Sequence, residues 1–197
     1  MTYINNTGKP SVTQMFRAYI NTDFFTDDGR DRGNYIHAAA AAYLLGQFIP
    51  SIPDEWSGYF DSFRRWADLM VDEVVFCERR IVDHKLGFCG KPDAVVRLRG
   101  RFGLWLVDWK TSAGESKWWR LQTAAYRHLV EHGDADRSEA ENGDLGPERI
   151  PTAGGAAIRL KADGSTAVLH DYSDTYQRDW NVFLSVRNAY LFFKGEI

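Results

Sequence analysis

The stretch Gly90-Lys-Pro-Asp-Ala-Val-Val-Arg-Leu-Arg-Gly100 continues as Arg-Phe-Gly-Leu-Trp-Leu-Val-Asp-Trp-Lys-Thr-Ser112. Two short runs rich in apolar side chains flank a segment that carries two glycines, and the first of them alternates in character. This pattern predicts two antiparallel strands, 94–98 and 104–109, joined by a turn at 100–103. Because successive side chains of a strand point to opposite faces, the pairing of this hairpin decides which residues meet.

An even number of turn residues is favoured on energy. Asp93 is then expected opposite Lys110, and Val95 opposite Asp108. One face of the hairpin becomes wholly apolar and must belong to the core: Ala94, Val96, Leu98, Trp105, Val107 and Trp109. The other face gathers two carboxylates and a lysine at one end. An odd turn would instead bury the charge of Asp93 among the tryptophans.

Two neighbouring carboxylates provide the oxygen ligands that a hard divalent cation such as Mg²⁺ prefers. A lysine beside them can hold a water or stabilise charge on a phosphate. The pattern alone leaves a second interpretation open, a surface ion pair between Asp93 and Lys110 with Asp108 solvated. Arg97 and Arg99 continue the same face and are expected either to hold phosphates or to be solvated at the hairpin tip.

The rest of the chain predicts helices and strands on both sides of this hairpin. Before it, periodicity, alanine content and capping residues predict helices at 13–20, 33–48 and 55–72, a loop at 21–32, and a strand at 74–82. After it, we expect a helix at 117–131, a surface loop at 133–151, paired strands at 156–160 and 166–170, and a helix at 174–193. The order predicts a mixed α/β fold in which helices flank a central, largely antiparallel or mixed sheet.

Composition limits the classes of protein. A length of 197 residues favours one domain over 1–197, with a helical N-terminal part to about residue 72. The net charge of −3 argues against coating nucleic acid by bulk electrostatics, but it allows a site where metal ions supply positive charge. Cys77 and Cys89 are too few for a disulfide framework or a four-cysteine cluster. With neither a signal peptide nor a membrane-spanning run, the sequence predicts a cytoplasmic protein of a bacterial or phage-infected cell.

Pro92-Asp93 followed by Asp108-Trp109-Lys110 resembles the signature of the PD-(D/E)xK nuclease superfamily. The flanking residues of both motifs, up to Thr-Ser112, look like the branch formed by RecB-type nucleases and phage exonucleases. Further likenesses to that branch lie outside the hairpin: the segment Arg32-Gly33-Asn-Tyr-Ile-His37, Glu78, Gln122 and Tyr126.

The resemblance implies a restriction-endonuclease-like core and a role for each matched residue. Asp93, Asp108 and the main-chain carbonyl of Trp109 are expected to bind one or two Mg²⁺ or Mn²⁺ ions, with His37 or Glu78 completing the coordination. Lys110 would orient water or neutralise developing charge. Gln122 and Tyr126, four residues apart on one helix face, would line the catalytic site and orient Lys110. No iron–sulfur cluster is expected.

Alternatives remain open for several of these residues. His37 could be a packed histidine of an alanine-rich helix, and Glu78 could pair with Arg79, Arg80 or Lys91. One of Trp118 and Trp119 could stack on a base, although core packing is the favoured interpretation for both.

The sequence therefore predicts a metal-dependent nuclease that hydrolyses DNA. The resemblance favours an exonuclease on double-stranded ends or single strands in phage-type recombination or repair. Such an enzyme would work with a single-strand annealing or helicase partner, because the chain has no motor motifs. The alternatives are an endonuclease on the same scaffold, a catalytically silent nucleic-acid-binding module, and a structural protein with a coincidental motif.

Overall fold

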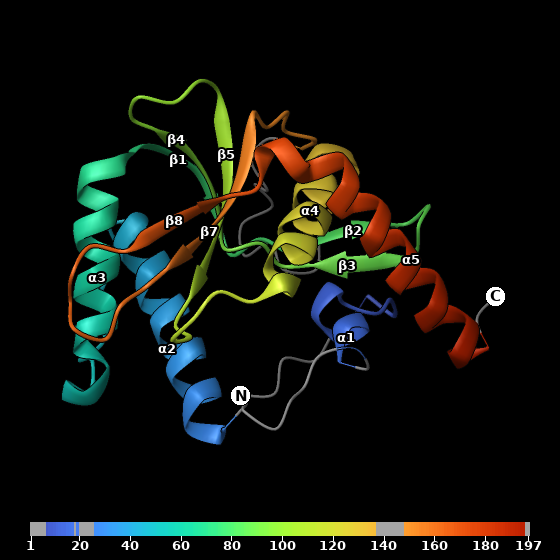
Figure 1. Ribbon diagram of the computed structural model, residues 1–197. Helices are drawn as coiled ribbons and strands as arrows, with labels where there is room; N and C mark the ends of the chain where they lie inside the picture. The colour runs from blue at the N-terminus through green and yellow to red at the C-terminus, as the bar shows by residue number, and fades with distance from the viewer. Residues whose placement is uncertain (1–6, 18, 20–25, 137–147, 196–197) are drawn as a thin grey trace.

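The hairpin lies at the centre of a five-stranded sheet in the computed structural model, which describes residues 7–17, 19, 26–136 and 148–195 (Figure 1). The strands, in spatial order, are β1 (Val71–Cys77), β4 (Ala94–Leu98), β5 (Leu104–Lys110), β7 (Gly154–Arg159) and β8 (Val168–Asp171). Neighbours are antiparallel except β5 and β7, which are parallel. The sheet is therefore mixed, and the expected α/β class is confirmed.

The predicted register of the hairpin is wrong by two residues. Val95 pairs with Leu106 and not with Asp108. Gly100 and Gly103 both adopt left-handed backbone, with φ of 72° and 70°, and the pairing stops at Arg97 and Leu104. A shift of two keeps every side chain on its predicted face. Continued by one pair, the observed register brings Asp93 opposite Asp108 instead of opposite Lys110.

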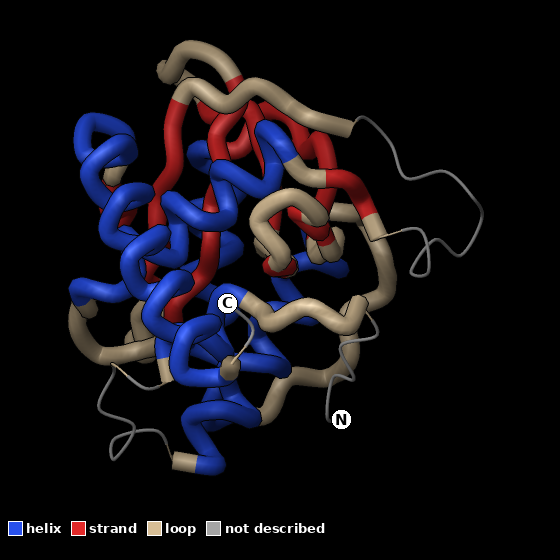
Figure 2. Tube along the Cα trace, turned by 90° about the vertical axis from the view of Figure 1, so that its right-hand side faces the viewer, coloured by secondary structure: helices blue, strands red, loops and turns tan. Residues whose placement is uncertain are grey.

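Two helical layers cover the two faces of this sheet, as Figure 1 shows. On one side, α2 (Asp27–Leu44) and α3 (Asp54–Met70) pack against the face that the sequence predicted to be apolar. On the other side lie α1 (Val12–Phe16), α4 (Lys117–His132) and α5 (Tyr176–Lys194). In Figure 2, which turns the right-hand side of Figure 1 toward the viewer, α4 and α5 lie in front of the large sheet.

The two strands between β1 and β4 join a short strand after α4 in a second, smaller sheet. Its strands are β2 (Ile81–Asp83), β3 (Phe88–Gly90) and β6 (Asp134–Ala135), in the order β3-β2-β6. The single strand predicted at 74–82 is thus wrong, because the chain breaks at Glu78, whose φ is 52°. Gly90 ends β3 directly against α4, where an added Cβ would lie 2.6 Å from the Tyr126 ring.

The predicted helices are present with shifted ends. Helix α2 begins at Asp27 because the Thr26 side chain accepts a hydrogen bond from Gly29 N–H, so the loop predicted for 27–32 is wrong. Residues 18, 20–25 and 137–147, within a predicted helix and two predicted loops, lie outside the described residues. The hairpin of β7 and β8 is confirmed, and a 3₁₀ turn, η2 (Ser173–Thr175), leads from it into α5.

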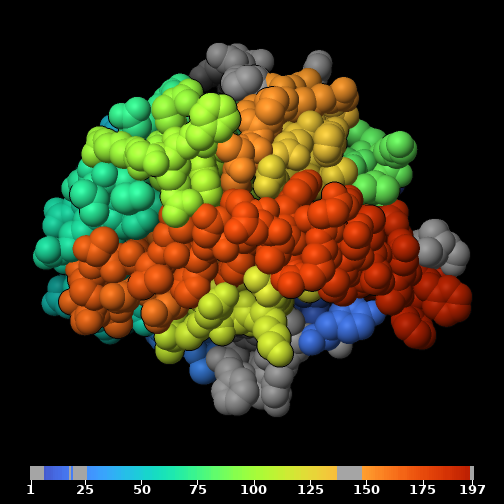
Figure 3. All heavy atoms as spheres, turned by 45° about the horizontal axis from the view of Figure 1, so that its top comes forward, coloured from blue at the N-terminus to red at the C-terminus, as the bar shows by residue number. Residues whose placement is uncertain are grey.

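In Figure 3 the β7–β8 hairpin and α5 form a continuous orange-to-red band across one face. None of the helices described is both long and apolar enough to cross a membrane.

Candidate active site

Asp93, Asp108 and Lys110 meet where β4 begins and β5 ends. Both carboxylates are buried, with 4% and 2% of their surface exposed. Lys110 Nζ forms an ion pair with Asp108 Oδ2. Asp93 is held across the hairpin, because the main-chain N–H of Trp109 donates to its Oδ2 at 2.6 Å. The three residues that the sequence singled out are therefore brought together.

Two further side chains reach this point from other elements. His37 comes from the middle of α2, and its Nδ1 lies 2.9 Å from Asp93 Oδ1. Glu78 follows the last residue of β1, and its main-chain N–H donates to the Asp93 carbonyl at 2.8 Å. The left-handed backbone of Glu78 is strained for a residue with a Cβ, and such strain is a common feature of functional sites. Lys91 Nζ lies 2.9 Å from Glu78 Oε2, one of the pairings expected for this glutamate.

The crowding of these groups shifts their proton affinities. Burial raises the pKa of Glu78, and so does the charge of Asp93. Burial likewise raises the pKa of Asp93; His37 opposes this and Asp108 adds to it. For His37, burial alone lowers the pKa, but the facing carboxylates, Asp93 foremost, raise it to about 9. Such a group of buried carboxylates is electrostatically suited to a cation.

The donor set fits a divalent metal ion. Ligand atoms of His37, Glu78 and Asp93 all lie within 4.8 Å of one another, and they form the one such group of three found in the described residues. Carboxylate oxygens with one imidazole nitrogen suit Mg²⁺ or Mn²⁺. Asp108 is not part of this group, and its Oδ2 forms an ion pair with Lys110. Its direct ligation of a metal, and that of the Trp109 carbonyl, remain predictions.

Lys110 is also held from α4. Gln122 Oε1 accepts a hydrogen bond from Lys110 Nζ at 2.6 Å, and Gln122 Nε2 donates to the Tyr126 hydroxyl at 3.1 Å. Burial, with a further contribution from Asp108, raises the pKa of Tyr126. Thr13 opposes this shift in pKa and so lies near the same hydroxyl, a neighbour that sequence reasoning missed because no motif links residues so far apart. Gln122 and Tyr126 thus lie where they would orient Lys110.

The residues predicted to contact nucleic acid do not form one group, as Asp93, Asp108 and Lys110 do. Arg97 pairs with Glu73 at 2.9 Å and Arg99 lies 3.8 Å from Asp72, both toward the turn of the hairpin and away from Asp93. Trp119 is buried, so neither face of its ring is open to a base in this structure. Trp118 is half-buried, and Lys110 Nζ lies 5.0 Å from the centre of its ring.

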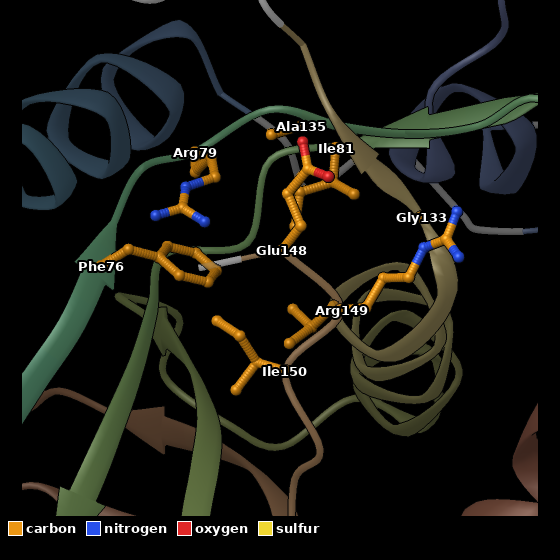
Figure 4. Close-up of a pocket in the computed structure, with 9 residues that line it drawn as sticks. Phe76, Arg79, Ile81, Gly133, Ala135, Glu148, Arg149 and Ile150 are labelled. Atoms are coloured by element: carbon orange, nitrogen blue, oxygen red, sulfur yellow. The ribbon is translucent and has the colours of Figure 1, made fainter. Parts of the chain in front are cut away.

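A small cavity elsewhere does not belong to this site. Figure 4 shows it between β1, β2 and the end of α4, where Arg79 lies over the Phe76 ring. Its volume is about 10 Å³, room for about one water molecule. None of the predicted site residues lines it, and it is too small for a nucleotide.

Comparisons with known proteins add little to this geometry. No protein-family model and no curated protein matches the chain. Among solved structures, the chain is similar to LHK-Exo in complex with dAMP, with a TM-score of 0.33 and 15% sequence identity, over 96% of this chain and 90% of that one. A likeness this distant carries no argument about activity, so the function rests on the residues themselves.

Proposed function

We propose that this protein is a divalent-metal-dependent nuclease that hydrolyses phosphodiester bonds of DNA. The observation that carries the proposal is the meeting of Asp93, Asp108 and Lys110 at one end of the hairpin, beside His37 and Glu78. Charges of both signs are buried together there. Burying them costs desolvation free energy, and clusters of this kind are typical of functional sites. The resemblance of the motifs to PD-(D/E)xK nucleases supports the same reaction.

The residues divide into two groups by chemistry. His37, Glu78 and Asp93 would hold Mg²⁺ or Mn²⁺, which when bound supplies Lewis-acid polarisation of the scissile phosphate. Lys110 has three N–H donors, and Asp108 and Gln122 engage two of them. The third is left for the attacking water or a phosphate oxygen. An ammonium fixed in this way stabilises the charge that develops as the water oxygen bonds to phosphorus and the bond to the leaving sugar oxygen breaks.

Cleavage of a labelled linear duplex by the full chain tests this proposal. We expect cleavage with Mg²⁺ or Mn²⁺ and none after chelation with EDTA. Asp108→Asn and Lys110→Met should each lower the rate by roughly 100-fold or more while circular dichroism remains that of the parent. Asp163→Asn, on the exposed β7–β8 turn, is the matched control and should cut at the parental rate. Parental rates for both site variants would refute the proposal.

The exonuclease subtype is a further proposal, supported by the resemblance alone. A covalently closed circle separates it from an endonuclease, because only an endonuclease opens a circle that has no ends. A role in recombination or repair, beside an annealing or helicase partner, is proposed on the same ground. Phosphate contacts by Arg97 and Arg99 and base stacking by Trp118 are also proposals.

A catalytically silent nucleic-acid-binding module is distinguished by its metal chemistry. Calorimetric titration with MnCl₂ should release or absorb heat that Asp93→Asn abolishes. A silent module would show no such carboxylate-dependent heat, and it would leave both the linear duplex and the circle intact.

A further inference from the structure

Two lysines lie at the site, and they differ in their partners and in how far their side chains are exposed. Lys110 pairs with Asp108, is tied to Gln122 as well, and has 10% of its side chain exposed. Lys91 pairs with Glu78, and 23% of its side chain is exposed. Lys110 is thus fixed in the interior, whereas Lys91 lies at the rim, on the segment that leads into β4.

The carboxylate of Glu78 pairs with Lys91 and is also a candidate ligand of a divalent cation, so the two positive charges compete for it. Its ligand oxygen belongs to the same group as those of His37 and Asp93, all within 4.8 Å of one another. A cation held by this group lies close to the ammonium that is 2.9 Å from Glu78 Oε2. At similar distances a doubly charged ion repels the ammonium more strongly than one carboxylate attracts it. The contact between Glu78 and Lys91 is therefore the one that a bound cation would weaken.

We infer that Lys91 is a displaceable counter-ion: it neutralises Glu78 while the site lacks a divalent cation, and when a cation binds it moves to a phosphate of the DNA strand. The inference rests on the proposed nuclease function and adds a substrate contact to it. It also makes Lys91, and not an arginine of the hairpin tip, the residue that links metal binding to DNA binding.

The local structure allows this exchange without a change of fold. Pro92 follows Lys91 and restricts the backbone of Lys91 to extended conformations, which favours movement of the side chain alone. Lysine has a four-carbon stem and a compact, strongly hydrated charge that can be solvated in transit. Because Asp93 is two residues away, the ammonium stays at the end of the hairpin where the scissile phosphate would lie.

Metal affinity gives the first test. MnCl₂ is titrated into the full chain and into Lys91→Met, which keeps an unbranched side chain of nearly the same length and removes its charge. We expect Lys91→Met to bind Mn²⁺ about threefold or more tightly, because the competing ammonium is gone. Lys85→Met, on the exposed turn between β2 and β3, is the control for removing a positive charge and should bind Mn²⁺ as the parent does.

DNA affinity gives the second test. Binding of a duplex of about 20 base pairs is measured at several salt concentrations with Ca²⁺ in place of Mn²⁺. A lost phosphate contact should lower the slope of log K against log salt by about one in Lys91→Met. Lys91→Arg keeps the charge and should retain the parental slope.

The outcomes separate this inference from the proposed function. If the parent shows no Mn²⁺ binding that depends on Asp93, the nuclease proposal itself falls. If the parent binds Mn²⁺ but Lys91→Met binds it equally or more weakly, the counter-ion role is refuted. An unchanged salt slope refutes the phosphate contact. Should Lys91→Met not fold by circular dichroism, Lys91→Gln takes its place in both measurements.

Discussion

Asp93 and Trp109 are joined across the hairpin, because the main-chain N–H of Trp109 donates to Asp93 Oδ2 at 2.6 Å. The other oxygen of the same carboxylate faces His37 at 2.9 Å. One carboxylate therefore has a structural oxygen and an oxygen directed at the candidate metal group. The backbone of β5 orients Asp93 before any ligand arrives, which is how a rigid site is prepared on strands.

The two tasks of Asp93 can be separated by substitution. Asp93→Asn keeps an oxygen for the Trp109 N–H, whereas Asp93→Ala leaves that buried donor without an acceptor. We expect Asp93→Asn to be the more stable variant by about 1–3 kcal/mol in urea unfolding. Both should lose the Mn²⁺-binding heat of the parent. Equal stabilities would show that the hydrogen bond contributes nothing.

Gln122 is expected to act on the reaction through Lys110. Gln122→Leu removes the acceptor of Lys110 Nζ, so the ammonium loses its fixed position and kcat should fall by about 10- to 100-fold. The Kd for Mn²⁺ should not change, because Gln122 does not contact the metal group. Gln47→Leu, on an exposed segment, is the control. A change in Mn²⁺ affinity equal to that in kcat would contradict a positioning role.

The sequence predicted the hairpin faces well because periodicity carries that information. Alternation assigned Ala94, Val96 and Trp109 to one core, and all three lie there. The register was missed by two residues, since it depends on the left-handed backbone at Gly100 and Gly103, which no alternation encodes. The error preserved the faces, and so the candidate site survived it.

Contacts between distant elements set the limit of prediction from the sequence. The pairing of Glu78 with Lys91 was one of three that the sequence left open, and only the folded chain distinguishes them. For Trp119 the sequence favoured core packing, and the side chain is buried, but base stacking stayed open because a helical tryptophan near a predicted site has the same local pattern in a core and at a surface. Thr13 gave no signal at all.

The apolar face of the hairpin should dominate stability. Phe63 is fully buried, and its ring lies edge-on to that of Trp109 with centroids 5.0 Å apart. Phe63→Ala should lower the free energy of unfolding by about 3–5 kcal/mol, because it removes the ring and leaves a cavity. Phe102→Ala, at the hairpin tip with 91% exposure, should change it by less than about 0.5 kcal/mol. Urea denaturation measures both, and similar losses would show that the core is wrongly placed.

The α4–α5 contact should make stability depend on pH through His128. Its ring stacks on Trp180 with centroids 3.9 Å apart, and its Nε2 lies 2.9 Å from Asp83 Oδ2. Burial lowers the pKa of His128 below its ordinary value of 6.5, although Asp83 opposes the shift.

Because the folded-state pKa of His128 is the lower one, the unfolded chain binds more protons as the pH falls below about 6.5. The stabilising contribution of the neutral ring is therefore present above that pH and is lost as the pH falls through the folded-state pKa. His128→Phe keeps the stacking and removes the titrating group, so its urea-unfolding free energy should decline less than that of the parent between pH 7.5 and pH 5.5, a window spanning the ordinary pKa by roughly one unit on each side. His84→Asn, on an exposed turn, should decline as the parent does. A parental decline in His128→Phe would assign the pH dependence to other groups.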